Sequence, residues 1–296
     1  MILSSTPRFS QIVREVWKPL AVLGVWDVIV TAFYMLSEAR APSLPLTIFG
    51  TVLGLFLGFR DNSAYQRWWE GRILWGSMIN ASRNLARACI AFIPGEPAAA
   101  RDLRQSIVLR HIAYVHALRC HLRRLPECPE MRELLSQEEA DAAAARANPA
   151  NALLDGNGVR AAEALQRGWI DTIQQTHLER VMVDIANAQG GMERLKNTPL
   201  PMQYRFFPAF FTRLFCVLLP IGLVETLGWA TPIGSTLAGL MFLAALQIGD
   251  DLTDPFSNTV HDVPMTAMCR TIEIDLKQAI GADAPAPLKP VRDVSW

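Results

Sequence analysis

Four long apolar segments constrain this chain more than any other feature of its sequence. They cover residues 19–36, 45–59, 210–228 and 232–249. Each approaches the ~20 residues that a helix needs to cross a bilayer hydrocarbon layer ~30 Å thick. Several apolar helices of this length are difficult to bury in one soluble domain of 296 residues. The segments therefore predict an all-α integral membrane protein with four transmembrane helices.

Basic residues are distributed unevenly between these segments. The stretch 60–205 is rich in arginine, whereas the link 37–44 holds one arginine beside one glutamate and the link 228–232 holds no basic residue. Lysine and arginine stay on the cytoplasmic side of short loops. The pattern predicts a multi-pass protein with both termini in the cytoplasm, a cytoplasmic helical region at 60–205, and a C-terminal tail at 250–296.

Composition excludes several other classes of function. The 28 Lys and Arg residues balance the 28 Asp and Glu residues, which argues against a nucleic-acid partner. No CxxC pair occurs, so the five cysteines are interpreted as reduced packing thiols. His111, His116 and His121 are five residues apart, a spacing that turns about 140° per step and scatters them around a helix. We therefore expect neither a metal site nor a cofactor.

The second apolar segment opens a longer helical stretch. Pro45 suits the first turn of a helix, and the next proline is Pro94. A continuous helix over 45–92 would be about 70 Å long. Only residues 45–59 are apolar, about 22 Å at the same rise, which is short for a lipid-exposed span and favours a shielded, inward position.

Helices are also expected at 101–136 and 159–196. Residues 136–158 are small and polar and end in turn-forming residues, so they are interpreted as a surface excursion. The tail after Ala284 is rich in proline and is expected to be extended.

Three ridges of residues four apart run along segment 45–59. A ridge of glycines allows helix backbones to approach closely, which is how helices associate inside lipid. The ridges are Gly50, Gly54 and Gly58; Thr51, Leu55 and Phe59; and Val52, Phe56 and Arg60. Their periodicity does not decide which ridge faces a pore.

Three short motifs resemble the bestrophin family. The first follows the second apolar segment and contains Asn62, Tyr65, Arg67, Trp68, Trp69, Glu70 and Arg72. The second is GGMERLKNTPLP at 190–201, and the third is Asp-Pro-Phe at 254–256. The motifs occur in the family's order on a matching four-span plan, so the chain is interpreted as one bestrophin-like domain over 1–296.

The resemblance implies a homopentameric ion channel in a bacterial inner membrane, with lipid and small monovalent ions as its other partners. In the family the second span lines the pore and narrows it to a neck of three stacked apolar side chains. Counted onto this sequence, the neck is Thr51, Leu55 and Phe59, in which Thr51 departs from the wholly apolar pattern. The family also has a second constriction near the cytoplasmic exit, and counting back from the 190–201 motif places it at Ile173. An isoleucine that simply packs in the interior is an equally good interpretation of this position.

The identity of the ion stays open at this point. The family favours chloride, and a monovalent-cation channel of the same architecture is the alternative. A neutral neck carries no ring of charge to decide between them. Arg60 and Arg67 below the neck would raise the local anion concentration, while Asp61 and Glu70 nearly offset them.

Acidic residues raise further alternatives. Asp250, Asp251, Asp254 and Asp262 are spread out, so calcium gating is not expected. Residues 250–254 also match a DDxxD pattern, as in a membrane prenyltransferase, and a non-conducting scaffold shares the same composition. Asp27 and Glu225 lie within apolar segments and are open candidates for the ion path.

Overall fold

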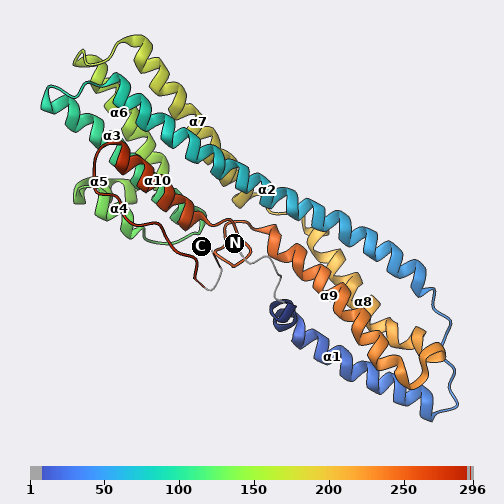
Figure 1. The fold of residues 1–296 in the computed structure, drawn as a ribbon. Coiled ribbons are helices and arrows are strands. Elements are labelled where there is room, and N and C mark those ends of the chain that lie inside the picture. The colour runs from blue at the N-terminus through green and yellow to red at the C-terminus, as the bar shows by residue number, and fades with distance from the viewer. Residues whose placement is uncertain (1–8, 292–293, 295–296) are drawn as a thin grey trace. The chain divides into compact units, whose positions relative to one another are not determined.

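The computed structural model describes residues 9–291 and residue 294. The remaining residues at both ends, for which we predict a cytoplasmic location, lie outside the described part. Helices are the only extended regular elements among the described residues (Figure 1). They are α1 (Phe9–Leu36), α2 (Leu46–Phe92), α3 (Ala98–Leu122), α4 (Pro129–Leu134), α5 (Gln137–Ala144), α6 (Pro149–Gln166), α7 (Thr172–Asn197), α8 (Met202–Leu227), the 3₁₀ turn η1 (Gly228–Ala230), α9 (Thr231–Thr253) and α10 (Met265–Ala279).

The helices form two compact units. The apolar unit comprises residues 9–68 and 199–254 of the described chain, and the polar unit comprises residues 69–198 and the described residues from 255 onward. Helix α2 contributes its first part to the apolar unit and the rest to the polar unit. The predicted all-α architecture is confirmed.

The apolar unit is a bundle in which α1, α8 and α9 pack side by side (Figure 1). Leu53 and Leu57 of α2 join its core, where they meet Phe215, Leu219 and Leu246. The α2 and α8 members of this core lie four apart on their own helices, so each of these helices presents one apolar face to the core.

Two helical stretches of the described chain are long and apolar enough to cross a membrane, namely Arg14–Leu36 and Met202–Thr253. The second stretch contains α8, η1 and α9, and is therefore long enough for two of the predicted spans. Helix α2 does not meet the same test, in keeping with the shortness of its apolar part. The count of four spans stays a prediction.

Helix α2 runs without interruption for 47 residues, as predicted. The carbonyl of Pro45 accepts a hydrogen bond from the Phe49 amide at 3.1 Å, which places the proline in the first turn. The helix ends at Phe92, two residues before Pro94, because a proline cannot continue the ladder of hydrogen bonds.

The polar unit is organised around α3, which packs against α4, α6, α7 and α10. Almost every residue of α3 from Ile107 to Cys120 is buried, as expected for a central helix. Its buried polar groups find partners on neighbouring helices. Tyr114 donates to Gln189 Oε1 at 2.9 Å, and His111 Nε2 lies 2.8 Å from the Ser82 hydroxyl.

Two expectations for this region were wrong. The helix expected over 101–136 ends at Leu122, and the expected surface excursion at 136–158 contains α5 and part of α6. The reason lies in the pair Asn148-Pro149, in which the Asn148 side chain caps α6 and the proline occupies its first turn. From there, mostly apolar or small residues on one face of the helix are buried, namely Ala150, Leu153, Leu154, Asn157, Ala161 and Ala164.

Candidate functional site

The predicted neck residues lie on a face of α2 that the chain's own helices leave uncovered. Leu55 and Phe59 are each 61% exposed, and Thr51 is also exposed. On the same helix, Leu53 is 5% exposed and Leu57 is 3% exposed. Alternation over so few residues separates a packed face from an apolar face that is free to meet a pore, lipid or another subunit.

The hydroxyl of Thr51 is engaged within its own helix. It donates a hydrogen bond to the carbonyl of Thr47 at 2.7 Å. A threonine that bonds back in this way has committed its only hydroxyl proton to the backbone. Because its hydroxyl proton is already used, Thr51 presents a less polar surface at the predicted neck than a threonine with a free hydroxyl would.

The glycine ridge divides into two parts. A Cβ on Gly50 would lie 3.1 Å from Phe215 Cζ, so this glycine permits close packing of α2 on α8. A Cβ on Gly54 or Gly58 would meet nothing among the described residues within 4 Å. Gly50 thus serves packing inside the chain, whereas Gly54 and Gly58 present an open, flat surface beside the neck ridge.

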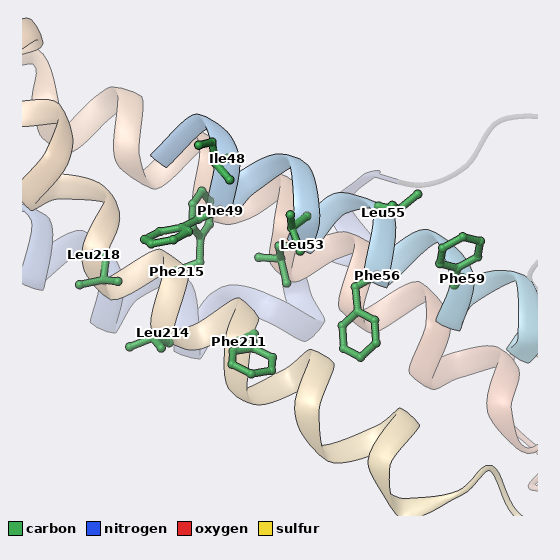
Figure 2. Close-up of a pocket in the computed structure, with 11 residues that line it drawn as sticks. Ile48, Phe49, Leu53, Leu55, Phe56, Phe59, Phe211, Leu214, Phe215 and Leu218 are labelled. Carbon is green, nitrogen blue, oxygen red and sulfur yellow. The ribbon is translucent and has the colours of Figure 1, made fainter. Parts of the chain in front are cut away.

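An apolar groove of about 730 Å³ lies between α2 and α8 (Figure 2). Phe56 extends from α2 on the side of Phe211, whereas Leu55 extends from the opposite side of the ribbon (Figure 2). The groove is lined by Ile48, Phe49, Val52, Leu53, Leu55, Phe56, Phe59, Phe211, Leu214, Phe215 and Leu218. Such a continuous apolar surface suits lipid or a neighbouring subunit better than water.

Arg60 does not point with the neck residues. Its side chain is 1% exposed, and its guanidinium donates to the Leu246 carbonyl at 2.9 Å and pairs with Asp61 and Asp250. Arg67 likewise reaches α9, where its Nε donates to the Thr253 carbonyl at 3.1 Å. Both arginines therefore hold α2 against the end of α9. Their effect on the local anion concentration, which Asp61 and Glu70 would nearly offset, stays a prediction.

The backbone at Gly249 makes room for this arginine. A Cβ at that position would lie 2.5 Å from Arg60 Nη1 and would also collide with the Asp61 carboxylate. The sequence analysis did not predict that Arg60 would be buried beside Asp61, Asp250 and Gly249, although the spacing of residues on α2 indicates it. Arg60 stands seven residues after Leu53, two helical turns along the same face, so the core face of α2 runs into the arginine.

The first and second motifs meet in the polar unit. Glu70 forms an ion pair with Arg194 of α7. One turn farther along α2, a methyl carbon of Leu74 would lie 2.8 Å from a Cβ on Gly191, so this glycine lets α7 approach α2 closely. The first and second motifs therefore contact each other where α2 and α7 pack together.

The third motif packs against the first in the same unit. A Cβ on Gly71 would lie 3.1 Å from Phe256 Cζ and 3.2 Å from Pro255 Cγ. Phe256 is fully buried. Within the apolar unit, Tyr65 stacks on Trp68 with ring centroids 6.2 Å apart. The second and third motifs thus each contact α2, and none of these contacts involves Thr51, Leu55 or Phe59.

The carboxylates of the apolar segments also have local partners. Asp27 is 1% exposed and accepts hydrogen bonds from the hydroxyls of Ser235 at 3.0 Å and Thr236 at 2.7 Å, both on α9. Glu225 accepts a hydrogen bond from the Ala41 amide at 2.9 Å. Asp27 therefore joins α1 to α9, and Glu225 joins α8 to the link before α2. Both carboxylates are engaged within the chain.

The remaining candidates lie elsewhere. Ile173 is 80% exposed in the first turn of α7, just after the Asp171 capping box. Asp251 accepts a hydrogen bond from Gln247, and Asp262 accepts two from Thr259. Asp250, Asp251 and Asp262 therefore each bond to a different residue, namely Arg60, Gln247 and Thr259.

The chain resembles known proteins along almost its whole length. Residues 3–278 match the family described as Bacterial/Fungal Bestrophin protein. The voltage-dependent anion channel-forming protein mll4386 of Mesorhizobium japonicum is 34% identical over 98% of this chain and 95% of the relative. The voltage-dependent anion channel-forming protein YneE of Escherichia coli K12 is 34% identical over 84% of this chain and 80% of the relative.

Solved structures agree with the sequence relatives. The crystal structure of a bacterial bestrophin homolog from Klebsiella pneumoniae superposes with a TM-score of 0.85 at 30% identity. That likeness covers 90% of this chain and 99% of the Klebsiella chain. By sequence over nearly its full length, and by fold, this chain belongs to the bacterial and fungal bestrophin family.

Proposed function

We propose that this chain is the subunit of a membrane channel that conducts small monovalent anions such as chloride. Its relatives in Mesorhizobium japonicum and Escherichia coli are named anion channel-forming proteins. Family membership indicates a channel rather than an enzyme, so the prenyltransferase alternative was wrong. Asp250 of the DDxxD-like stretch is in addition occupied by Arg60.

One observation carries the proposal, namely the uncovered ridge of Thr51, Leu55 and Phe59 on a helix whose other face is packed. When copies of the chain surround a common axis, such ridges form stacked, uncharged rings. Rings of this kind restrict water and pass weakly hydrated ions more readily than strongly hydrated ones. The open surface at Gly54 and Gly58 lies beside the ridge, where an adjacent subunit would pack.

We propose a homopentamer with four spans in each subunit, as the family resemblance implies. The apolar groove between α2 and α8 supports association, because an exposed groove of this kind in a single subunit invites lipid or a second copy. Ile173, exposed at the start of α7, remains our candidate for a second constriction on the cytoplasmic side.

Cation conduction is the second candidate, and a specific observation keeps it in view. Arg60 and Arg67 are both turned toward α9, so the ridge itself presents no basic side chain that would favour anions. Selectivity must then come from neutral groups and from the dehydration energy of each ion.

A reversal-potential measurement separates these candidates. Purified protein is placed in planar bilayers across a tenfold KCl gradient, where perfect selectivity gives about 59 mV, with a sign that names the permeant ion. We expect the sign of chloride conduction. The opposite sign favours the cation channel, and the absence of current from well-folded protein favours a non-conducting scaffold.

We further propose an inner-membrane location with both termini and the polar unit in the cytoplasm. The arginine-rich stretch 60–205 supports this orientation. Reporter fusions at residues 41 and 150 test it, because the two positions should fall in opposite compartments. Matching compartments would contradict the topology.

A further inference from the structure

Two cysteines of the polar unit lie close together although neither belongs to the family-like motifs. Cys120 is in the last turn of α3, and Cys128 directly precedes α4. Their sulfur atoms and a carboxylate oxygen of Glu130 all lie within 4.8 Å of one another. Both cysteines are buried, with 3% of Cys120 and 9% of Cys128 exposed.

The guanidinium group of Arg119 lies beside this pair of cysteines. One guanidinium nitrogen of Arg119 lies 3.4 Å from Cys120 Sγ and 2.8 Å from a Glu130 oxygen. A metal ion held by these ligands would have to stand beside that positive charge. The arrangement therefore disfavours a metal and favours a thiolate, because thiolates form next to arginine and to hydrogen-bond donors.

The pKa values of the two thiols are shifted in opposite directions. The neighbouring Cys128 thiol, followed by the Arg119 guanidinium, lowers the pKa of Cys120 to about 6. The Cys128 thiol donates to Glu130 Oε2 at 3.7 Å, and the neighbouring Cys120 together with burial raises the pKa of Cys128. Burial raises the pKa of Cys89 and of Cys269 to about 12. Together with the contact from Arg119 to Cys120 Sγ, these shifts favour Cys120 as the nucleophile among the cysteines of the polar unit, with Cys128 as the thiol beside it.

We propose that Cys120 and Cys128 form an oxidation site for hydroperoxides, in which Cys120 reacts first and Cys128 closes a disulfide. The Cys120 thiolate attacks one peroxide oxygen, the O–O bond breaks, and the departing alkoxide or hydroxide takes a proton from water. Cys128 then attacks the sulfur of the resulting sulfenic acid, and hydroxide leaves with the Cys128 proton as water. The two thiols lose two electrons, which the peroxide gains.

The local backbone suits this step. Only the short segment 123–127 separates α3 from the residue before α4, and Arg123 anchors it by donating to the Thr266 hydroxyl at 2.8 Å. Closing the sulfur–sulfur distance from within 4.8 Å to the ~2 Å of a disulfide needs side-chain rotation and a small shift of this segment. The thiol of Cys269 is engaged with the backbone, where it donates to the Val115 carbonyl at 3.6 Å.

The test treats the purified full-length protein with hydrogen peroxide at neutral pH, blocks the remaining thiols, and maps tryptic peptides by mass spectrometry. Arginines at 119, 123, 124 and 132 place the two cysteines in separate peptides, 120–123 and 125–132. We expect these peptides to become joined by a disulfide that dithiothreitol reverses. Cys89 and Cys269 should stay unmodified under the same conditions.

Three variants make the test specific. Cys128→Ser should accumulate a sulfenic acid on Cys120, which dimedone traps, without forming the disulfide. Arg119→Lys should keep the reaction, whereas Arg119→Gln should slow it about tenfold, because the charge beside the thiolate is lost. Cys89→Ser is the matched control and should react like the wild-type protein.

Several results would overturn the proposal. They are the absence of the 120–128 disulfide in folded protein after peroxide treatment, a disulfide from Cys120 to Cys269 instead, or equal oxidation of all cysteines. Stoichiometric binding of Zn²⁺ that survives dialysis and protects both thiols would identify a metal site in its place. None of these readouts depends on ion conduction, so they stand apart from the proposed channel function.

Discussion

Leu55 and Leu57 offer a matched pair that separates the neck from the core of the bundle. Both are leucines on α2, and they are two residues apart. Leu55 is 61% exposed, whereas Leu57 is 3% exposed within the cluster that includes Phe215 and Leu246. We expect Leu55→Ala to change conduction and to leave stability nearly intact. Leu57→Ala should do the reverse.

The magnitudes follow from how much packing each side chain has. Removing a buried leucine side chain costs about 2–5 kcal/mol, because lost contacts and a residual cavity add together. Leu57 is almost fully enclosed, so Leu57→Ala should cost an amount in that range. Leu55 keeps only about two fifths of its surface in contact with its own chain, which reduces the expected loss to about 1 kcal/mol.

Leu55→Ala should change the conductance more than Leu57→Ala does, which is the reverse of their effects on stability. In the proposed pore, Leu55→Ala shortens every side chain of the middle ring, which would widen the constriction and weaken its resistance to water. We expect single-channel conductance to rise about twofold or more, with no such rise in Leu57→Ala. Conductance is measured in planar bilayers, and unfolding is followed by thermal denaturation of the same preparations. Unchanged conductance in Leu55→Ala, with a rise in Leu57→Ala, would refute the assignment of the neck.

Three further predictions address other parts of the chain. Asn62→Asp places a ring of carboxylates one turn below the neck, so the reversal potential in a KCl gradient should move toward the potassium value; an unmoved potential would contradict the pore face. Hydrogen bonds from His116 and Lys277 and the nearby charge of Arg270 lower the pKa of Glu273 to about 2, so its ionised form adds stability that is complete above pH ~4.5 and is lost as the pH falls toward 2. Glu273→Gln should therefore lower the unfolding free energy by about 3 kcal/mol at pH 7 and by progressively less below pH ~4.5. Denaturation of the wild-type protein and the variant at pH 7 and below pH ~4.5 measures this difference. Gly191→Ala should force Leu74 to move and cost about 1–3 kcal/mol, whereas Gly190→Ala beside it should be nearly neutral in the same thermal assay, since a Cβ at Gly190 would have no described atom within 4 Å.

The parts of the fold that could be predicted rest on long, one-dimensional signals. The absence of proline between Pro45 and Pro94 was enough to predict α2 as one helix. Apolar length predicted α8 and α9, because a helix that meets lipid must be apolar along its whole extent. These signals need no knowledge of which residues touch.

Contacts between distant residues were beyond the same reasoning. The start of α6 was missed because Asn148-Pro149 fits a turn and a helix start equally well, and only packing on α3 decides between them. The pair of Cys120 and Cys128 was interpreted as ordinary packing for a similar reason. Their spacing has no metal or redox signature, and the loop that brings them together is visible only in three dimensions.

The register of α2 separates Arg60 from the ridge of Thr51, Leu55 and Phe59. At about 100° per residue, Thr51, Leu55 and Phe59 span an arc of about 80°, and Asn62 falls inside that arc. Arg60 lies about 140° from its centre and is buried against α9. Arg60 thus fastens α2 to α9, and the ridge of Thr51, Leu55 and Phe59 carries only neutral side chains. If that face lines the pore, an ion passing through must give up water to groups that return little of the hydration energy, and the ion with the weakest hydration passes most easily.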